Sequence, residues 1–223
     1  MIDIKQGDNV DLIKELKDES IDAIITDPPY GINKAGILND DSLEAYYKML
    51  PECYRVLKND SVFATFASIK RLPEFFMNNP FDYKWQYIVY INNGMVWDDL
   101  GANRYMPVLI FQKGKPKIKS MLDVYECSTS VKQCDTRVHP TQKRLDVLLK
   151  LVNAITKIGD TILDPFMGSG TTGVASLSLR RNFIGYELDK TYFERAKERL
   201  ENTNVVINKN GKNGLEEFEV END

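Results

Sequence analysis

Apolar residues along this chain follow two alternating spacings. Short runs of β-branched and aromatic residues have the length of buried strands. Between them, apolar residues recur every three or four positions, as on one face of a helix. This order predicts an α/β domain in which helices cover both faces of a mostly parallel sheet. The predicted strands are Ile21–Thr26, Ser61–Ala67, Trp85–Ile91, Val108–Gln112, Thr161–Leu163 and Phe183–Tyr186, and the predicted helices are Leu43–Leu57, Leu145–Thr156, Thr171–Leu179 and Thr191–Leu200.

Two segments and the C-terminal tail break the alternation. Asn92–Tyr105 is rich in Asn, Asp and Gly, and Gly114–Pro140 mixes Lys, Ser and Thr without a clear period, so both are predicted to be irregular. The tail Asn208–Asp223 is predicted to fray. With 223 residues the chain can bury one sizeable core, and we expect one catalytic domain spanning 1–223.

Composition narrows the cellular setting and argues against a metal site. The sequence shows neither a secretory signal nor an apolar run long enough to cross a bilayer, so we expect a soluble cytoplasmic protein without a membrane partner. Its three cysteines form no C-x-x-C pair, and His139 is the single histidine. Ordinary ligand spacing therefore cannot be assembled, and we expect reduced thiols and no metal.

Charge is distributed unevenly along the chain. The net charge is −4, yet Arg104–Lys150 holds ten Lys and Arg against four Asp and Glu. A basic strip on an acidic body is compatible with a polyanionic partner, although an ordinary solvated surface explains it equally well.

A glycine-rich turn follows the predicted strand at Thr161–Leu163. Gly168 and Gly170 allow a ligand close to the backbone, and the helix beginning at Thr171 offers unpaired N–H groups. Asp164 ends the strand, and Glu187 ends the next one about 20 residues later, where a carboxylate can accept ribose hydroxyl hydrogens. A dinucleotide is disfavoured because Asp164 would repel a pyrophosphate, whereas the ammonium group of a methionine moiety would attract it.

A second turn, Asp27-Pro28-Pro29-Tyr30, ends the strand Ile21–Thr26. The two prolines supply carbonyls without competing N–H donors, so Asp27 and the carbonyl of Pro28 can converge on one amino group. An exocyclic amine of a nucleobase needs such acceptors, because its lone pair is delocalised into the ring. The face of Tyr30 can stack on an extruded base.

These motifs resemble those of the DNA amino-methyltransferases. The resemblance rests on Asp27-Pro28-Pro29-Tyr30, on the Asp164–Thr172 run and on His139–Lys143, and it spans Ile2 to Leu200. The catalytic motif precedes the cofactor motif, as in the circularly permuted β class. The resemblance implies a doubly wound, seven-stranded, Rossmann-like fold, S-adenosylmethionine as cofactor and the N6 amine of adenine in DNA as target.

The resemblance also implies roles for individual residues. Asp27 would hold the target amine beside the cofactor, Tyr30 would stack on the flipped base, and Phe166 would lie beside the cofactor. Asp8 would contact the cofactor adenine, and Thr141 and Lys143 its methionine end. The chain departs from the family pattern at Arg144, where a proline is usual, which loosens the helix start. We interpret His139 as a structural residue.

Target recognition is expected to lie outside the shared core, at about 92–137. The alternating lysines predict phosphate contacts along an extended segment, and Asn103 and Arg104 are candidates for base edges. So short a region suggests a short recognition site, a homodimer, or a partner subunit that helps to hold DNA. The lysines are Lys113, Lys115, Lys117 and Lys119.

Direct methyl transfer without a covalent enzyme intermediate is predicted, since no cysteine lies beside the Pro-Pro turn. An N4-cytosine methyltransferase has the same geometry, although Asp before Pro-Pro-Tyr favours adenine. A protein or RNA methyltransferase is less consistent with the motifs, because those resemble Asn-Pro-Pro-Tyr. A non-catalytic protein that binds the cofactor or DNA remains the alternative of a different class.

Overall fold

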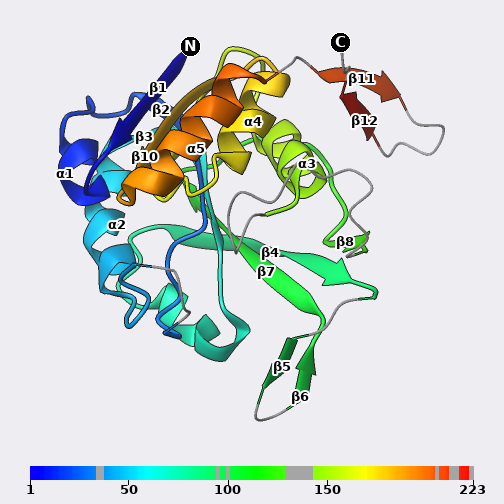
Figure 1. The fold of residues 1–223 in the computed structure, drawn as a ribbon, viewed down its shortest axis with the longest axis horizontal. Helices are drawn as coiled ribbons and strands as arrows, with labels where there is room; N and C mark the ends of the chain where they lie inside the picture. Colours follow the sequence, from blue (N-terminus) through cyan, green and yellow to red (C-terminus); the bar gives the residue numbers. More distant parts are fainter. Residues whose placement is uncertain are drawn as a thin grey trace.

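The computed structural model describes residues 1–33, 38–93, 96–98, 101–128, 143–203, 206–210 and 216–220. Its centre is an eight-stranded sheet with helices packed on both faces (Figure 1). The strands follow the order β1-β10-β9-β2-β3-β7-β4-β8. They are β1 Ile2–Gln6, β2 Ile21–Thr26, β3 Leu57–Phe66, β4 Asp82–Ile91, β7 Tyr105–Lys113, β8 Val124–Cys127, β9 Thr161–Asp164 and β10 Asn182–Glu187.

Seven of these strands run in one direction, and β7 is reversed. β1, β10, β9, β2 and β3 pair in parallel, β7 pairs antiparallel with β3 and β4, and β8 is parallel to β4. The carboxyl ends of the parallel strands therefore meet at one edge, which we call the carboxyl edge. In open α/β sheets this is the edge at which ligands bind.

Alternate residues of β2 belong to two different cores, as a doubly wound sheet requires. Ala23 and Ile25 pack in the cluster that contains α3, whereas Ile24 packs in the cluster that contains α1 and α2. Both faces of β2 are buried, which explains why its apolar residues form a continuous run rather than an alternating pattern. The helices are α1 Asn9–Lys14, α2 Glu44–Val56, α3 Leu145–Ile155, α4 Thr171–Ser178 and α5 Lys190–Glu201.

Several elements differ from the sequence expectation. The described sheet has eight strands rather than seven, because β8 forms inside a segment expected to be irregular. The other expected loop contains a hairpin of β5 (Val96–Asp98) and β6 (Gly101–Asn103), which projects from the ends of β4 and β7 (Figure 1). Short segments without strong alternation are hard to predict as strands from sequence, because pairing with neighbouring strands determines whether they become extended.

Two further elements were not expected from the pattern. A 3₁₀ helix, η1, covers Ile69–Phe76, and α1 lies between β1 and β2 along the chain. In the tail, β11 (Val206–Asn210) and β12 (Glu216–Val220) pair as a hairpin, so the prediction of a frayed tail is wrong for these residues.

Candidate active site

The strand β2 delivers Asp27 to the carboxyl edge. The strand is buried along most of its length, and Asp27 follows Thr26 directly, so the carboxylate emerges where the sheet ends. Pro28 and Pro29 then turn the chain without contributing N–H groups. The structure thus brings the predicted turn to the edge at which the predicted cofactor turn also lies.

Both carboxylate oxygens of Asp27 have partners. The Tyr30 hydroxyl donates to Oδ1 at 2.5 Å, and the Lys143 ammonium donates to Oδ2 and forms an ion pair. Burial and the charge of Asp27 raise the pKa of Tyr30 well above its usual value, so the phenol stays protonated and remains a donor. The ammonium also lies 5.1 Å from the ring centre of Phe66 and 5.6 Å from that of Tyr30. Two aromatic faces and a carboxylate therefore surround one cationic nitrogen.

The glycine turn leads from β9 into α4. Gly168 and Gly170 both have positive φ, +52° and +75°, and Gly170 is the N-cap of α4. A Cβ at Gly168 would meet nothing within 4 Å, whereas one at Gly170 would lie 3.3 Å from the Cβ of Ala196. Gly168 thus borders open space, and Gly170 allows α4 to pack against α5. A direct cofactor contact was predicted for both glycines, and the geometry supports it for Gly168.

Asp164 ends β9 and is almost fully buried. The Thr26 hydroxyl donates to its Oδ1 at 2.8 Å, and the N–H of Phe166 donates to the same oxygen at 3.1 Å. Burial raises the pKa of Asp164 to about 7, although these hydrogen bonds favour the ionised form. Near neutral pH this carboxyl group can therefore exist in either protonation state.

Glu187 ends β10 beside the glycine turn. Its Oε2 accepts the N–H of Gly168 at 2.9 Å, and its Oε1 accepts the N–H of Asp189 at 2.8 Å. Burial raises the pKa of this carboxyl group, while the two backbone donors favour ionisation. The Gly7 N–H donates to the Glu187 carbonyl at 2.9 Å, which brings the α1 N-cap, Asp8, to the same edge.

One cavity of about 860 Å³ joins the two turns. Acidic side chains outnumber basic ones among its lining residues, so it suits a ligand that carries positive charge or donates hydrogen bonds. Most predicted catalytic and cofactor residues line it, together with Asn103 from the predicted recognition segment. These are Asp8, Asp27, Pro28, Pro29, Tyr30, Lys143, Asp164, Phe166, Gly168, Thr171 and Glu187.

Some predicted residues lie elsewhere. Gly170 and Arg104 are not among the lining residues of the cavity, and Thr141 and His139 are outside the described residues. Arg104 lies at the base of the β5–β6 hairpin, where its guanidinium is 5.1 Å from the ring centre of Tyr90 and donates to the carbonyl of Asn92.

The alternating lysines that begin at Lys113 lie at the opposite edge of the sheet. β7 is antiparallel, so Lys113 at its end is opposite Ser61, the first residue of β3 that pairs with β7. Lys113 is buried and donates to the carbonyls of Leu57 and Tyr54 at 2.7 and 3.0 Å. This engagement corrects the prediction that Lys113 contacts phosphate, because an ammonium used by buried carbonyls is not available to DNA. Lys115 and Lys117 are exposed.

Lys119 is tied to the end of α3 at the same edge. Its ammonium donates to Asn153 at 2.9 Å, and its backbone N–H donates to the carbonyl of Ala154 at 2.9 Å. Phosphate contacts by Lys115, Lys117 and Lys119 remain predictions, and they concern a surface separate from the cavity.

Three residues near the site escaped the sequence analysis. Phe66 ends β3 beside Lys143, Asp40 accepts hydrogen bonds from the turn after Asp27, and Arg71 donates to the same turn. A buried acid in a polar loop is the signal that could have pointed to Asp40, but burial is not visible in one sequence. In the described part of the chain no group of three or more His, Cys, Asp and Glu residues could hold a metal ion.

No helix among the described residues is both long enough and apolar enough to span a bilayer.

Comparison with known proteins gives a consistent result. Residues 21–198 match the model of a DNA methylase family, N6_N4_Mtase. The chain is 33% identical over 227 residues to the type II methyltransferase M.HpaI of Haemophilus parainfluenzae, covering 85% of this chain and 71% of that protein. It is 28% identical over 242 residues to the type II methyltransferase M2.DpnII of Streptococcus pneumoniae, covering 89% of each.

Solved structures resemble the whole fold. The crystal structure of an M1.HpyAVI–SAM complex matches with a TM-score of 0.69 and 31% identity, covering 90% of this chain and 99% of that one. The cytosine-N4-specific PvuII DNA methyltransferase matches with a TM-score of 0.77 at 16% identity, covering 92% and 88%, which shows the shared fold alone.

Proposed function

The chain belongs to the DNA methylase family N6_N4_Mtase, and we propose that it methylates the N6 amino group of adenine in DNA with S-adenosylmethionine as methyl donor. The observation that carries the proposal is the single cavity in which the carboxylate of Asp27 and the glycine turn at Gly168 meet. An acceptor for an amine and a cradle for a nucleoside cofactor are the two parts that such a transfer requires.

The residues at the glycine turn fit the cofactor. Open space beyond Gly168 leaves room for a ligand against the backbone, and Glu187 has further acceptor positions, because a carboxylate offers about four. We propose that Glu187 accepts the ribose hydroxyls, that Asp164 faces the ammonium group, and that Phe166 and Asp8 contact the remaining surface. The acidic lining of the cavity favours this cationic molecule.

At the other end, Asp27 and Tyr30 act on the target base. When bound, S-adenosylmethionine supplies an electrophilic methyl group on a sulfonium. We propose that Asp27 and the Pro28 carbonyl accept the two amine hydrogens, which localises the nitrogen lone pair toward that group. Tyr30 provides a stacking face, and its hydroxyl holds Asp27 in place through Oδ1. The proton that the nitrogen loses can pass to Asp27.

Lys143 occupies the position beside Asp27 that the amine needs. Its ammonium binds Oδ2 of Asp27 and lies against the ring faces of Tyr30 and Phe66. A target amine must therefore share that oxygen or displace the ammonium. The resemblance predicts that Lys143 contacts the methionine end of the cofactor. Its side chain is long and flexible, so a short movement would let it leave Asp27 and reach the cofactor.

Base specificity rests on Asp27, because Asp before Pro-Pro-Tyr favours adenine over cytosine in enzymes of this kind. The experiment is to express the chain in a bacterium that lacks its own DNA methyltransferases and to digest the DNA to nucleosides for mass spectrometry. We expect N6-methyladenine from the wild type and none from Asp27→Ala. Detection of N4-methylcytosine instead of N6-methyladenine would change the proposed target base to cytosine. An unmodified genome would contradict the proposal.

We further propose that the β5–β6 hairpin takes part in target recognition. It projects from the sheet (Figure 1), and Asn103, the last residue of β6, lines the cavity. An Asn side chain can pair with an adenine edge through two hydrogen bonds. The hairpin is short, so a second copy of the chain or a partner subunit would supply further DNA contacts. Assignment to the permuted β class remains a prediction from the order of the motifs.

A further inference from the structure

The turn Asp27-Pro28-Pro29-Tyr30 cannot fix its own backbone. Proline has no N–H, so the first backbone donors after Asp27 are those of Tyr30 and Gly31. Both donate to one oxygen, Oδ1 of Asp40, at 2.5 and 2.8 Å. Asp40 is 5% exposed, and in this protected position a hydrogen bond to a carboxylate is stronger than one to a neutral acceptor. A residue outside the motif, ten positions after Tyr30, thus accepts both N–H groups of the turn.

Arg71 binds the same turn through the turn's backbone carbonyl. Its Nη1 donates to the carbonyl of Gly31 at 2.7 Å, while its Nε and Nη2 bind both oxygens of Glu74 at 2.8 and 2.5 Å. The fork to Glu74 limits the freedom of the guanidinium. Asp40 therefore holds the N–H groups and Arg71 holds the next carbonyl, and we call these two residues the turn clamp.

Gly31 shows how closely the turn clamp encloses the backbone. Its φ is +68°, and a Cβ there would lie 2.1 Å from Nη1 of Arg71 and 2.9 Å from the backbone carbon of Ser42. Both the conformation and the space exclude a side chain. The glycine directly after Tyr30 is thus explained by the clamp rather than by a ligand.

The ring of Tyr30 is held by two other residues, Phe75 and Asp27. Phe75, from the same 3₁₀ helix as Arg71, packs edge-on against Tyr30 with 6.2 Å between ring centres. The Tyr30 hydroxyl in turn binds Asp27, so a shift of the Tyr30 backbone would move both the stacking face and the acceptor. Displacements of about 1 Å in such groups can lower a rate about 100-fold.

We propose that Asp40, supported by Arg71, is a positioning residue that sets Tyr30 and Asp27 for methyl transfer. This inference rests on the proposed function. It predicts that loss of the clamp lowers kcat while binding of the cofactor, which the glycine turn and Glu187 carry, stays nearly unchanged.

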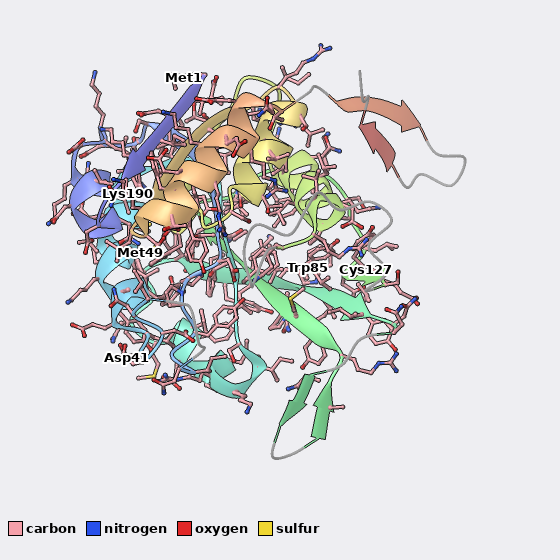
Figure 2. The ribbon with its side chains drawn as sticks, in the orientation of Figure 1. Met1, Asp41, Met49, Trp85, Cys127 and Lys190 are labelled. Carbon is pink, nitrogen blue, oxygen red and sulfur yellow. The ribbon has the colours of Figure 1, made fainter. Side chains whose placement is uncertain are left out.

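The test compares Asp40→Ala and Asp40→Asn with the control Asp82→Ala. Asp82 is exposed and is not among the lining residues of the cavity, whereas the acid next to Asp40, Asp41, labelled in Figure 2, lines it. The Asn oxygen can still accept both N–H groups without the charge, so Asp40→Asn should fall between Asp40→Ala and the wild type. Methyl incorporation from tritiated S-adenosylmethionine into DNA free of modification gives kcat and KM, and calorimetry gives cofactor affinity.

We expect kcat to fall roughly 10- to 100-fold in Asp40→Ala, with cofactor affinity within about two-fold of wild type. The control should behave as wild type. If Asp40→Ala lowers cofactor affinity and melting temperature together with kcat, the proposal is overturned, because such a general loss indicates a structural role only. If Asp40→Ala does not fold, partial activity and normal cofactor affinity in Asp40→Asn support the proposal, and full activity there together with unchanged amide exchange overturns it.

A second readout needs neither substrate nor cofactor. Amide hydrogen exchange at Tyr30 and Gly31 should be at least about tenfold faster in Asp40→Ala than in wild type, whereas exchange along β9 should not change. Unchanged exchange at Tyr30 and Gly31 would overturn the clamp even if activity fell. A wild type that transfers no methyl group would instead contradict the proposed function and leave the exchange result to decide the clamp.

Discussion

The two turns that meet in the cavity are held in different ways. The glycine turn after β9 is fixed by the neighbouring strand β10: the Met167 N–H donates to the carbonyl of Tyr186, and the Gly168 N–H donates to Glu187. In the Asp27 turn, Pro28 and Pro29 have no N–H to donate, and the turn is held by the side chains of Asp40, Arg71 and Lys143 from three segments outside the sheet. The cofactor turn is therefore held by the strand beside it, whereas the catalytic turn is held by side chains from outside the sheet.

The two turns are nevertheless joined at their bases. β2 and β9 are neighbours in the sheet, and the hydroxyl of Thr26, just before Asp27, donates to Asp164 at 2.8 Å. This bond places the last residue of one strand against the last residue of the other. Variants at each turn should therefore separate catalysis from cofactor binding only if they leave this bond intact.

Asp27→Ala should cause the largest functional loss. It removes the proposed acceptor of the amine, and such groups typically contribute about 10²–10⁴ to turnover. Cofactor affinity should remain within a few-fold, because Asp27 is at the other turn. Kinetics at saturating cofactor together with calorimetry measure both quantities, and near-normal turnover would remove Asp27 from the mechanism.

Glu187→Ala should produce the complementary defect. Two hydrogen bonds from ribose hydroxyls to a carboxylate are lost, each worth roughly 1.5–3 kcal/mol. Calorimetry should show affinity for S-adenosylmethionine falling by at least about 100-fold, while turnover at saturating cofactor falls much less. Unchanged affinity would contradict the ribose assignment. Because Glu187 also accepts from Gly168, a melting curve must show that the turn remains folded.

The contrast between the turns explains what the sequence could predict. The α/β order and the strand Ile21–Thr26 follow from runs of apolar residues, and the structure has this strand with the predicted bounds. β8 was not predicted, because its residues form a strand through pairing with β4, which lies more than 30 residues earlier. Pairing between distant segments leaves no local pattern.

The site follows the same rule. Most residues of the contiguous motifs line the cavity, whereas Asp40 and Arg71 lie in segments without a motif. Lys113 is the opposite case: its spacing with other lysines suggested a surface strip, but the register of β7 places its ammonium against the carbonyls of Tyr54 and Leu57. Charge patterns do not reveal burial.

Asp164 should make the stability of the protein depend on pH. Its pKa is raised from 3.8 to about 7, so between these values the folded state keeps a proton that the unfolded state releases. Stability contributed by that proton is present at low pH and is lost as pH rises toward 7. Asp164→Asn is neutral throughout, and relative to wild type it should gain roughly 2–3 kcal/mol between pH 5 and pH 8.

Melting curves without cofactor at pH 5 and pH 8 measure this difference. The matched control is Asp160→Asn, which changes the acid directly before the same strand. A stability difference between Asp164→Asn and wild type that does not change with pH would show that Asp164 is ionised in the folded protein.

The smallest expected effects separate the two edges of the sheet as DNA-binding surfaces. Lys70 is exposed and lines the cavity at the carboxyl edge, whereas Lys115 and Lys117 are exposed near the opposite edge. Each lost phosphate contact should lower the slope of log affinity against log salt by about 0.9. Because a flipped base must enter the cavity, we expect Lys70→Gln to lower this slope and the double variant Lys115→Gln/Lys117→Gln to change it less. Fluorescence anisotropy with a labelled duplex over a salt series measures this slope.

A decrease of the slope by about 1.8 in the double variant would instead show that DNA reaches the far edge, as the alternating lysines predict. A second copy or a partner would then present DNA to the cavity.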